Sequence, residues 1–217
     1  MKYAFIFFLS ISLLQTQPTL SAQSRDKQAS EILNEVTRKT LDYKSIKLDF
    51  TYTMENPAAN INESTSGVAM ISGDKYQLTI AGQTIISDGE TIWTIINDAQ
   101  EIQVNDASDD SGVFSPTKML TEYSNHYKSK LIPKITSFGG KNVHALELIP
   151  LEKKSYDKVN LYIDKTSMDL YIIEIYDQNG SKYTYKINRF DTHQPIDEKS
   201  FVLNKDEFPE YYLIDMR

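Results

Sequence analysis

Apolar and polar residues alternate from Ile46 to Glu55 in one long regular run. Because successive side chains of a strand point to opposite faces, this run predicts a β-strand with one apolar face. Shorter strand-like runs, separated by turn signals, lie at residues 68–71, 76–80, 85–86, 92–96, 102–104, 131–135, 143–149, 159–163, 170–176 and 183–187. About eleven short strands at this spacing predict a mainly β chain with a sandwich-like or barrel-like sheet.

Two segments have a helical pattern instead. Apolar residues recur at helical spacing before the first strand, at Ala29, Ile32, Leu33, Val36 and Leu41. They predict an amphipathic helix over residues 26–42. Farther along, Ser115 and Pro116 precede Met119 and Leu120, which is the pattern of a capped helix start with proline in the first turn, so a short second helix is expected there.

The stretch from Ile85 to Ile96 is apolar on both faces of its predicted hairpin. If Ser87 pairs with Glu90 around the Asp88-Gly89 turn, Ile85 lies opposite Ile92. Trp93 then lies opposite Thr84 and shares the other face with Ile95. A sheet with one wet side carries polar residues on that side, so both faces of this hairpin need a cover, and Trp93 is expected in a core.

The first 22 residues have the composition of a cleavable export signal. Lys2 gives a basic start, residues 3–14 are apolar apart from two serines, and Leu20-Ser21-Ala22 ends in small residues. Cleavage after Ala22 and export to the periplasm are therefore predicted. Residues 23–217 contain no Pro/Gly/Ser-rich linker and are expected to form one domain. No later run reaches about 18 apolar residues, the length that a spanning helix needs.

Composition excludes several classes of function. The chain has no cysteine, which rules out disulfides, thiol catalysis, cysteine-bound metals and a lipid-modified cysteine. Its 23 basic and 30 acidic residues give a net charge of −7, and loss of Lys2 with the signal leaves 22 basic residues and a net charge of −8. An acidic balance argues against nucleic acid as a partner.

No pattern of catalytic or metal-binding residues stands out. The three histidines, His126, His144 and His193, are scattered and form no HExxH-like spacing, and no G-x-S-x-G motif occurs. The acidic loop with Asp106, Asp109 and Asp110 lacks the order of a calcium loop. We therefore predict no enzyme activity, no cofactor and no metal. A lipid-modifying enzyme or acyl hydrolase that uses His126 or His144 is the alternative from another functional class.

Four stretches resemble the LolA family of outer-membrane lipoprotein carriers. They are GVAMISGDKYQLTI (67–80), ISDGETIWTIIN (86–97), LYIDKTSMDLYIIEIYDQNGSKYTYKINRF (161–190) and QPIDEKSFVLN (194–204). The S-D-G-x-x-hydrophobic-W run is the most specific of these features. The resemblance covers residues 24–205 and lies in the pattern more than in identity.

The resemblance implies a half-open antiparallel β-barrel with helices over its concave face and a hydrophobic cavity between them. The cavity would hold the acyl chains of lipoproteins, received from an inner-membrane ABC transporter and passed to an outer-membrane acceptor or to the membrane itself. By position, the ligand-binding residues would be Tyr76, Leu78, Ile80 and Ile85, joined by Phe50, Tyr52, Met54, Ile92, Met119 and Leu120.

Alternatives remain open from the sequence. The same apolar residues are compatible with a filled core, which would make the chain a β-rich adhesion or assembly module. The cargo could also be another acylated lipid or a glycolipid. The better-studied family members carry an arginine that controls the lid, but the corresponding place near Ser72 and Gly73 has none, so control of the lid must differ or be weaker. A monomer is expected.

Overall fold

The computed structural model describes residues 19–107, 126–193 and 195–217. This part of the chain contains one α-helix, α1 (Thr19–Asp42), and thirteen β-strands. The strands are β1 (Ile46–Asn56), β2 (Ile61–Ser72), β3 (Lys75–Ile80), β4 (Gln83–Ser87), β5 (Thr91–Ile96), β6 (Glu101–Asp106), β7 (Tyr127–Leu131), β8 (Ser137–Phe138), β9 (Lys141–Pro150), β10 (Tyr156–Asp164), β11 (Leu170–Asp177), β12 (Lys182–Asp191) and β13 (Tyr212–Asp215). Short 3₁₀ helices are η1 (Pro57–Ala59), η2 (Glu198–Phe201) and η3 (Lys205–Glu207). The helices in this part of the chain are not long and apolar enough to cross a membrane.

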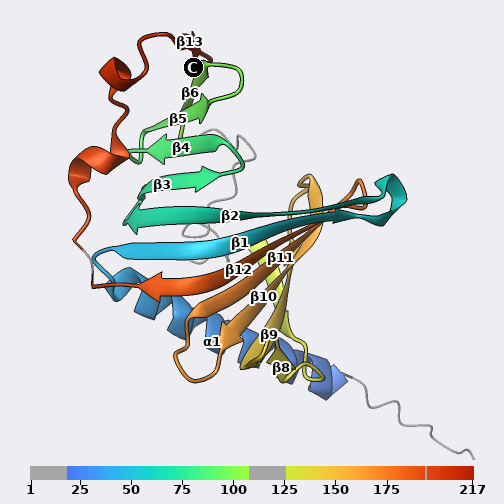
Figure 1. Cartoon of the computed structure of the whole chain (residues 1–217). Coiled ribbons are helices and arrows are strands. Elements are labelled where there is room, and N and C mark those ends of the chain that lie inside the picture. The colour runs from blue at the N-terminus through green and yellow to red at the C-terminus, as the bar shows by residue number, and fades with distance from the viewer. Residues whose placement is uncertain (1–18, 108–125, 194) are drawn as a thin grey trace, which may run out of the picture.

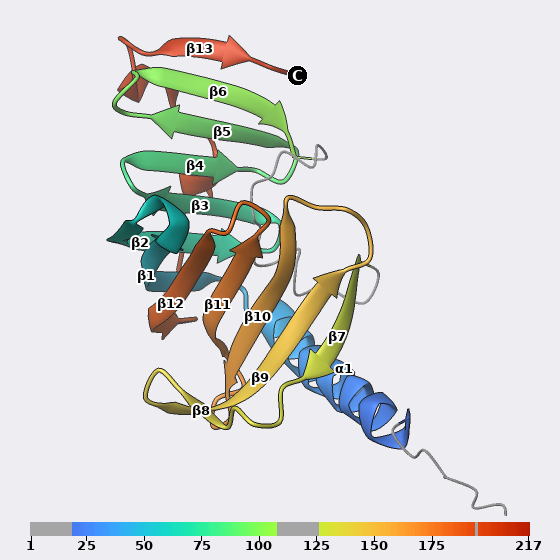
Figure 2. The same cartoon turned by 90° about the vertical axis from the view of Figure 1, so that its right-hand side faces the viewer.

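The strands form one open, curved sheet, which confirms the mainly β prediction. Their order is β13-β6-β5-β4-β3-β2-β1-β12-β11-β10-β9-β7, and β8 pairs with β9. Neighbours are antiparallel except β13, which runs parallel to β6. Figures 1 and 2 show the sheet twisting from the stack β13 to β2 into the fan β12 to β7, with α1 beside the fan.

The count of about eleven strands was too low, and one predicted strand was misplaced. β8 and β13 were missed, because two residues carry no periodic pattern and β13 follows the two 3₁₀ turns near the end of the chain. The strand expected at 131–135 instead ends at Leu131, and Pro133 lies in the connection that follows. Proline lacks the N–H that strand pairing needs, so a strand cannot continue through Pro133.

The register of the β4–β5 hairpin also differs from the prediction. Ser87 pairs with Ile92, Ile85 with Thr94, and Ile86 with Trp93, a shift of two residues. The cause is the side chain of Asp88, which accepts hydrogen bonds from the N–H groups of Glu90 and Thr91 at 2.9 and 2.8 Å and widens the turn. A shift of two preserves the faces, so Ile85 and Ile92 still share one face.

Helix α1 defines the inner face of the sheet. Its Ala29, Leu33 and Val36 are at most 1% exposed and pack into one core with inward-facing residues of β1, β2 and β9 to β12. The Oγ atoms of Ser30 and Ser129 lie 3.4 Å apart and link the helix to β7. The predicted helix is confirmed, but it begins at Thr19 instead of residue 26.

The chain's own C-terminal segment covers the outer face of β4 to β6. Ile86, Ile95 and Ile102 form a buried cluster there, with Trp93 packed against it. From the C-terminal segment, Leu203, Phe208 and Tyr211 pack onto this cluster. Trp93, predicted in a core, is half-buried and packs against this core cluster, and the cover over the second face of the hairpin is protein.

A candidate ligand-binding face

The register brings eight of the ten predicted ligand-binding residues to the inner face. Leu78 pairs with Ala69 on one side and Ile85 on the other, and Tyr76 and Ile92 both pair with Ser87. The residues of this set on the inner face are Phe50, Tyr52, Met54, Tyr76, Leu78, Ile80, Ile85 and Ile92. The other two, Met119 and Leu120, lie outside the described residues.

These eight residues differ in exposure. Phe50 and Ile92 are each only 5% exposed and belong to the packed interior. The other six are half-buried, and Tyr52, Tyr76, Leu78 and Ile80 pack against the main core. In Figure 1, α1 lies along the fan of strands and away from β3 to β5. Helix α1 therefore leaves part of the apolar inner face of β3 and β4 uncovered.

The inner face changes in character along β1. Ile46, Leu48 and Phe50 are buried and purely apolar, whereas Tyr52 and Met54 toward the tip are half-buried. On the neighbouring β12, Tyr183 stacks on Tyr52 with ring centroids 6.3 Å apart. The ring of Tyr185 lies 5.2 Å from that of Tyr52 and 5.9 Å from that of Phe50. An aromatic cluster thus continues the apolar surface toward the strand tips.

Burial raises the pKa values of the tyrosines on this face. Burial raises the pKa of the Tyr185 hydroxyl far above its ordinary value, with smaller contributions from Tyr52 and Tyr183. Burial also raises the pKa of Tyr76 and, together with the nearby Tyr183 and Glu63, that of Tyr52. All three phenols stay neutral at physiological pH, so this part of the face carries hydroxyl groups and no phenolate charge.

Gly67 makes room for the aromatic cluster. It pairs with Phe50 across β1 and β2, and a Cβ atom built on it would lie 2.3 Å from Cζ of Phe50. The ring of Phe50 therefore lies flat against the backbone of β2. A larger residue at position 67 would push the ring out of the core.

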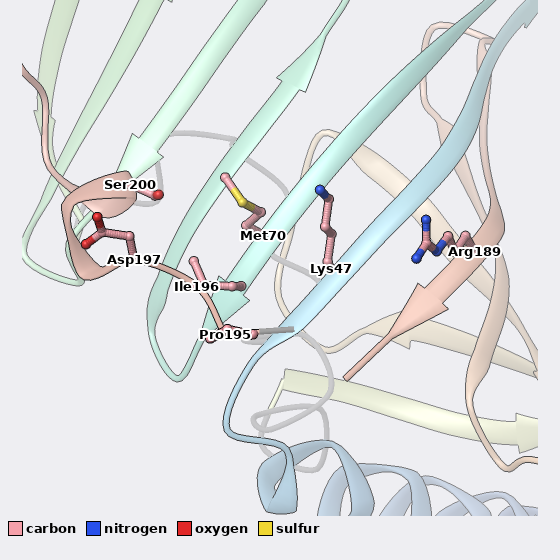
Figure 3. A pocket seen from close by; sticks show the side chains of 7 residues that line it. All are labelled: Lys47, Met70, Arg189, Pro195, Ile196, Asp197 and Ser200. Carbon is pink, nitrogen blue, oxygen red and sulfur yellow. The ribbon is translucent and has the colours of Figure 1, made fainter. Parts of the chain in front are cut away.

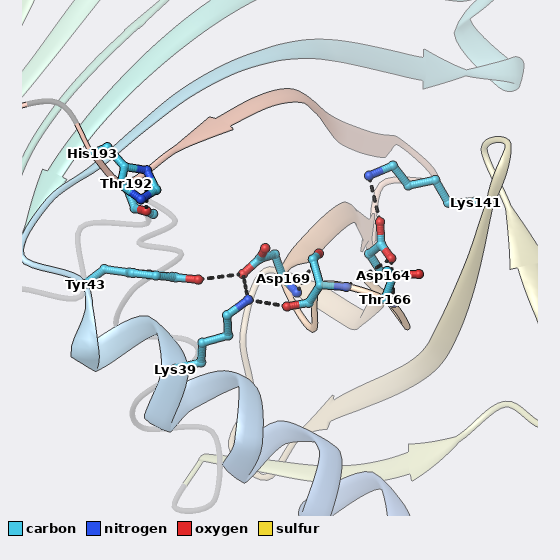
Figure 4. A network of polar contacts seen from close by, with 9 residues as sticks. Lys39, Tyr43, Lys141, Asp164, Thr166, Asp169, Thr192 and His193 are labelled. Carbon is cyan, nitrogen blue, oxygen red and sulfur yellow. Dashed lines mark hydrogen bonds and ion pairs between the residues drawn. The ribbon is translucent and has the colours of Figure 1, made fainter.

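A network of polar contacts holds the C-terminal end of α1 against the turn between β10 and β11 (Figure 4). Lys39 Nζ lies 2.7 Å from Oδ1 of Asp169 and also donates to the backbone carbonyl of Ser167. The hydroxyl of Tyr43 donates to the same Asp169 oxygen at 3.1 Å. Asp164 shapes the turn that presents these acceptors, because its Oδ1 accepts the N–H of Thr166 at 2.8 Å.

A pocket of about 470 Å³ lies on the outer face and is chemically different (Figure 3). It is lined by Lys47, Met70, Arg189, Pro195, Ile196, Asp197 and Ser200. Three of these side chains are charged, and Arg189 already pairs with Asp191 at 3.0 Å. Burying acyl chains among charges is unfavourable, and none of the predicted ligand-binding residues lines this pocket.

Comparison with known proteins identifies the family. The model of the outer membrane lipoprotein carrier protein LolA matches residues 42–204. The chain belongs to the LolA family. An uncharacterized conserved protein from Thermus thermophilus has a similar fold, with a TM-score of 0.55, 11% identity, and coverage of 87% of this chain and 99% of the other.

Two further structures match this LolA-family chain with lower TM-scores. A putative outer membrane lipoprotein-sorting protein domain from Vibrio parahaemolyticus has a TM-score of 0.48 and 16% identity, over 84% of this chain and 99% of the other. A LolA superfamily protein from Nitrosomonas europaea has a TM-score of 0.45 and 13% identity, over 81% and 97%. No curated protein matches in sequence.

The histidines do not form a cluster in this LolA-family chain. His144 lies on β9, where burial and the nearby Lys165 lower its pKa despite an opposing effect of Glu35. His193 is exposed beyond β12, and His126 precedes β7. In the described ranges, no three His, Cys, Asp or Glu side chains are grouped so that they could hold a metal ion.

Sequence reasoning missed two tyrosines of the inner face. Tyr127 on β7 and Tyr156 on β10 pack against the main core, and their hydroxyl groups hydrogen-bond to each other. The residues lie 29 positions apart, and no local pattern links them. Only the pairing of β7, β9 and β10 brings them together.

Proposed function

We propose that this chain is a periplasmic carrier that binds the acyl chains of lipoproteins and moves them from the inner to the outer membrane. The observation that carries the proposal is the apolar inner face of β3 and β4, which α1, the α-helix of the described residues, leaves partly uncovered in a chain of the LolA family. Half-buried Leu78, Ile80 and Ile85 offer apolar area there without any charge. Such a surface binds hydrocarbon while the polar surroundings keep the carrier in solution.

The energetics explain why acylated cargo needs a carrier. At about 0.8 kcal/mol for each buried CH₂, a chain of about 14 methylenes resists entry into water by about 11 kcal/mol. Free diffusion through the periplasm would be very slow at this cost. A carrier face must shield the chains but bind them less tightly than a bilayer does, so that delivery is downhill.

The partners follow from this role. An inner-membrane ABC transporter that releases lipoproteins would load the carrier, and an outer-membrane acceptor or the membrane itself would receive the cargo. The predicted export signal at residues 1–22 would direct the chain to the periplasm. In this role the protein binds and releases cargo, and it needs no catalytic group.

A matched pair of substitutions tests the binding face. Ile80 on β3 and Val68 on β2 are neighbours in the ladder, but Ile80 faces inward and Val68, which is 39% exposed, faces outward. Ile80→Asp should weaken binding of a fluorescent long-chain fatty acid by about tenfold or more, because a carboxylate is costly in an apolar site. Val68→Asp should leave binding unchanged. Equal effects of the two variants would contradict the proposal.

The cargo itself can be identified from the native protein. Purification from the periplasm followed by mass spectrometry should recover lipoproteins. Recovery of a glycolipid or of another acylated lipid would change the cargo but keep the binding face. If no acyl-bearing molecule co-purifies and the fatty-acid probe does not bind the wild type, the carrier role is contradicted.

A further inference from the structure

The inner face has a polarity gradient along the strands. At one end, buried Ile46, Leu48 and Ile71 form an apolar floor. Toward the tips of β1 and β2, Tyr52 faces Thr65 and Met54 faces the exposed Glu63. A molecule lying along these strands would meet hydrocarbon first and polar groups last.

The polar end is rich in tyrosine hydroxyls. Four inner-face tyrosines lie toward this end on four different strands: Tyr52 on β1, Tyr127 on β7, Tyr156 on β10 and Tyr183 on β12. We call these four residues the tyrosine band. The strand pairing supports this placement. Tyr183 lies opposite Met54 near the end of β1, and Tyr156 lies opposite Asp177 at the end of β11.

Among the residues that the structure describes, part of the hydrogen-bonding capacity of the tyrosine band is unused. Tyr127 and Tyr156 bond to each other. Within the described ranges, the hydroxyls of Tyr52 and Tyr183 form no hydrogen bond, although their rings are stacked and half-buried. A phenylalanine would supply the same apolar area, so the hydroxyl adds binding energy only when it meets a polar partner.

We propose that the tyrosine band binds the carbonyl and glycerol oxygens at the polar end of an acylated ligand, with the acyl chains directed toward the half-buried Leu78, Ile80 and Ile85 of the same face. This inference rests on the proposed function and adds the orientation and chemical class of the ligand. Neutral phenol groups suit it, because a phenol O–H donates to an ester or amide carbonyl and also accepts from a glycerol hydroxyl. The ligand is then bound through the ester, amide and glycerol groups that link its acyl chains, here called the linkage, as well as through the chains themselves.

Both a lipoprotein and a phospholipid carry such a linkage, and the probes distinguish these two sources. One probe is a synthetic triacylated cysteinyl peptide, which has acyl esters, an amide and a peptide. The second is phosphatidylglycerol, which has acyl esters and a phosphate. The third is an alkyl-chain fluorophore of similar length without ester or amide groups.

The test compares wild type with the double variant Tyr52→Phe/Tyr183→Phe. Loss of two hydrogen bonds should weaken binding of the ester-bearing probes by about tenfold or more, while the alkyl fluorophore binds as before. Each single variant should have a smaller effect. Tyr212→Phe is the matched control, since Tyr212 is 76% exposed on β13 and should not change binding of any probe. Thermal unfolding should be similar for all variants.

The outcomes separate this inference from the proposed function. A larger loss for the peptide than for phosphatidylglycerol identifies the lipoprotein linkage as the ligand, and the reverse identifies the phospholipid. If the double variant binds every probe as the wild type does, or loses the alkyl fluorophore equally, the tyrosine band has no role in the linkage and the inference is wrong, although the carrier face stands. If the wild type binds no probe at all, the proposed function fails and this inference fails with it.

Discussion

Lys39 Nζ lies 2.7 Å from Oδ1 of Asp169 and joins the last turns of α1 to the β10–β11 turn, 130 residues along the chain. The two side chains are 32% and 20% exposed. Tyr43, just beyond the end of the helix, donates to the same carboxylate. In this structure these side chains hold the C-terminal end of α1, and no arginine stands near Ser72 and Gly73.

Removing the charge of Asp169 should loosen this end of the helix. We expect Asp169→Asn to lower the free energy of unfolding by about 1 kcal/mol at neutral pH, because it weakens one partly buried ion pair. Urea unfolding measures the change. Asp42→Asn is the control: its pair with Arg38 is 3.9 Å long and both side chains are more than 70% exposed, so the loss should be negligible. Equal losses would contradict a special role of Asp169.

The same pair should depend on alkaline pH. Burial tends to lower the pKa of Lys39, but the hydrogen bonds and charges of Asp169 and Tyr43 outweigh it and raise the pKa above 10.5. Because the pKa of Lys39 is higher in the folded protein than in the unfolded chain, protonated Lys39 stabilises the fold at pH values below its pKa in the unfolded chain. This stabilisation is lost as the pH rises through its pKa in the folded protein. The stability difference between wild type and Asp169→Asn should therefore close above pH 10.5. A constant difference across this range would refute the linkage.

Gly67 and Phe50 should be energetically coupled. Gly67→Ala places a methyl group against the Phe50 ring and should cost about 1–3 kcal/mol of stability through overpacking. In the double variant with Phe50→Leu the cost should be less than the sum of the two single changes, since the smaller side chain gives space. Chemical unfolding of all four proteins measures the coupling, and Ser66→Ala on the exposed face should be neutral.

The cover on the outer face should be essential for stability. Phe201 in η2 is 0% exposed, whereas its neighbour Val202 is 52% exposed. Phe201→Ala should cost about 3–5 kcal/mol through the cavity it leaves, and Val202→Ala should cost little. Trp93, the single tryptophan, packs against the same cluster as residues of this C-terminal segment, so its fluorescence should shift to the red in the first variant only. An unshifted spectrum would mean that the segment stays closed without Phe201.

Glu147 should make the fold sensitive to acid. Its carboxylate lies 2.6 Å from Nζ of Lys130 and 2.9 Å from Nζ of Lys158. Burial acts to raise its pKa, but these two contacts lower it below 4.5. Because the pKa of Glu147 is lower in the folded protein than in the unfolded chain, its carboxylate stabilises the fold at pH values above its pKa in the unfolded chain. This stabilisation is lost as the pH falls through its pKa in the folded protein.

The measurement compares Glu147→Gln with wild type by urea unfolding at neutral pH and at pH values below 4.5. The variant should be less stable at neutral pH, and the difference should shrink on acidification. Glu152→Gln, at an exposed position, is the control and should follow the wild type at every pH. A difference that grows in acid would contradict the direction of the pKa.

Features that depend on near neighbours in the chain follow from the sequence. The alternation at Ile46 to Glu55 predicted β1 and its inner face correctly, and helical spacing predicted α1 with Leu33 and Val36 on its buried side. Prediction failed by two residues at the β4–β5 turn, because the hydrogen bonds of one side chain, Asp88, set the width of the loop.

The sequence by itself determined most of the strands and their faces, helix α1 and the resemblance to the LolA family, because periodicity and turn residues act between near neighbours. Only the tertiary structure decided that Leu203 and Phe208 pack onto the same cluster as Trp93, that Lys39 meets Asp169, and that Tyr127 meets Tyr156. Each of these contacts joins segments that are far apart in the chain. They depend on how the strands are ordered and how the sheet curves, and the periodicity of a single segment contains no information about either.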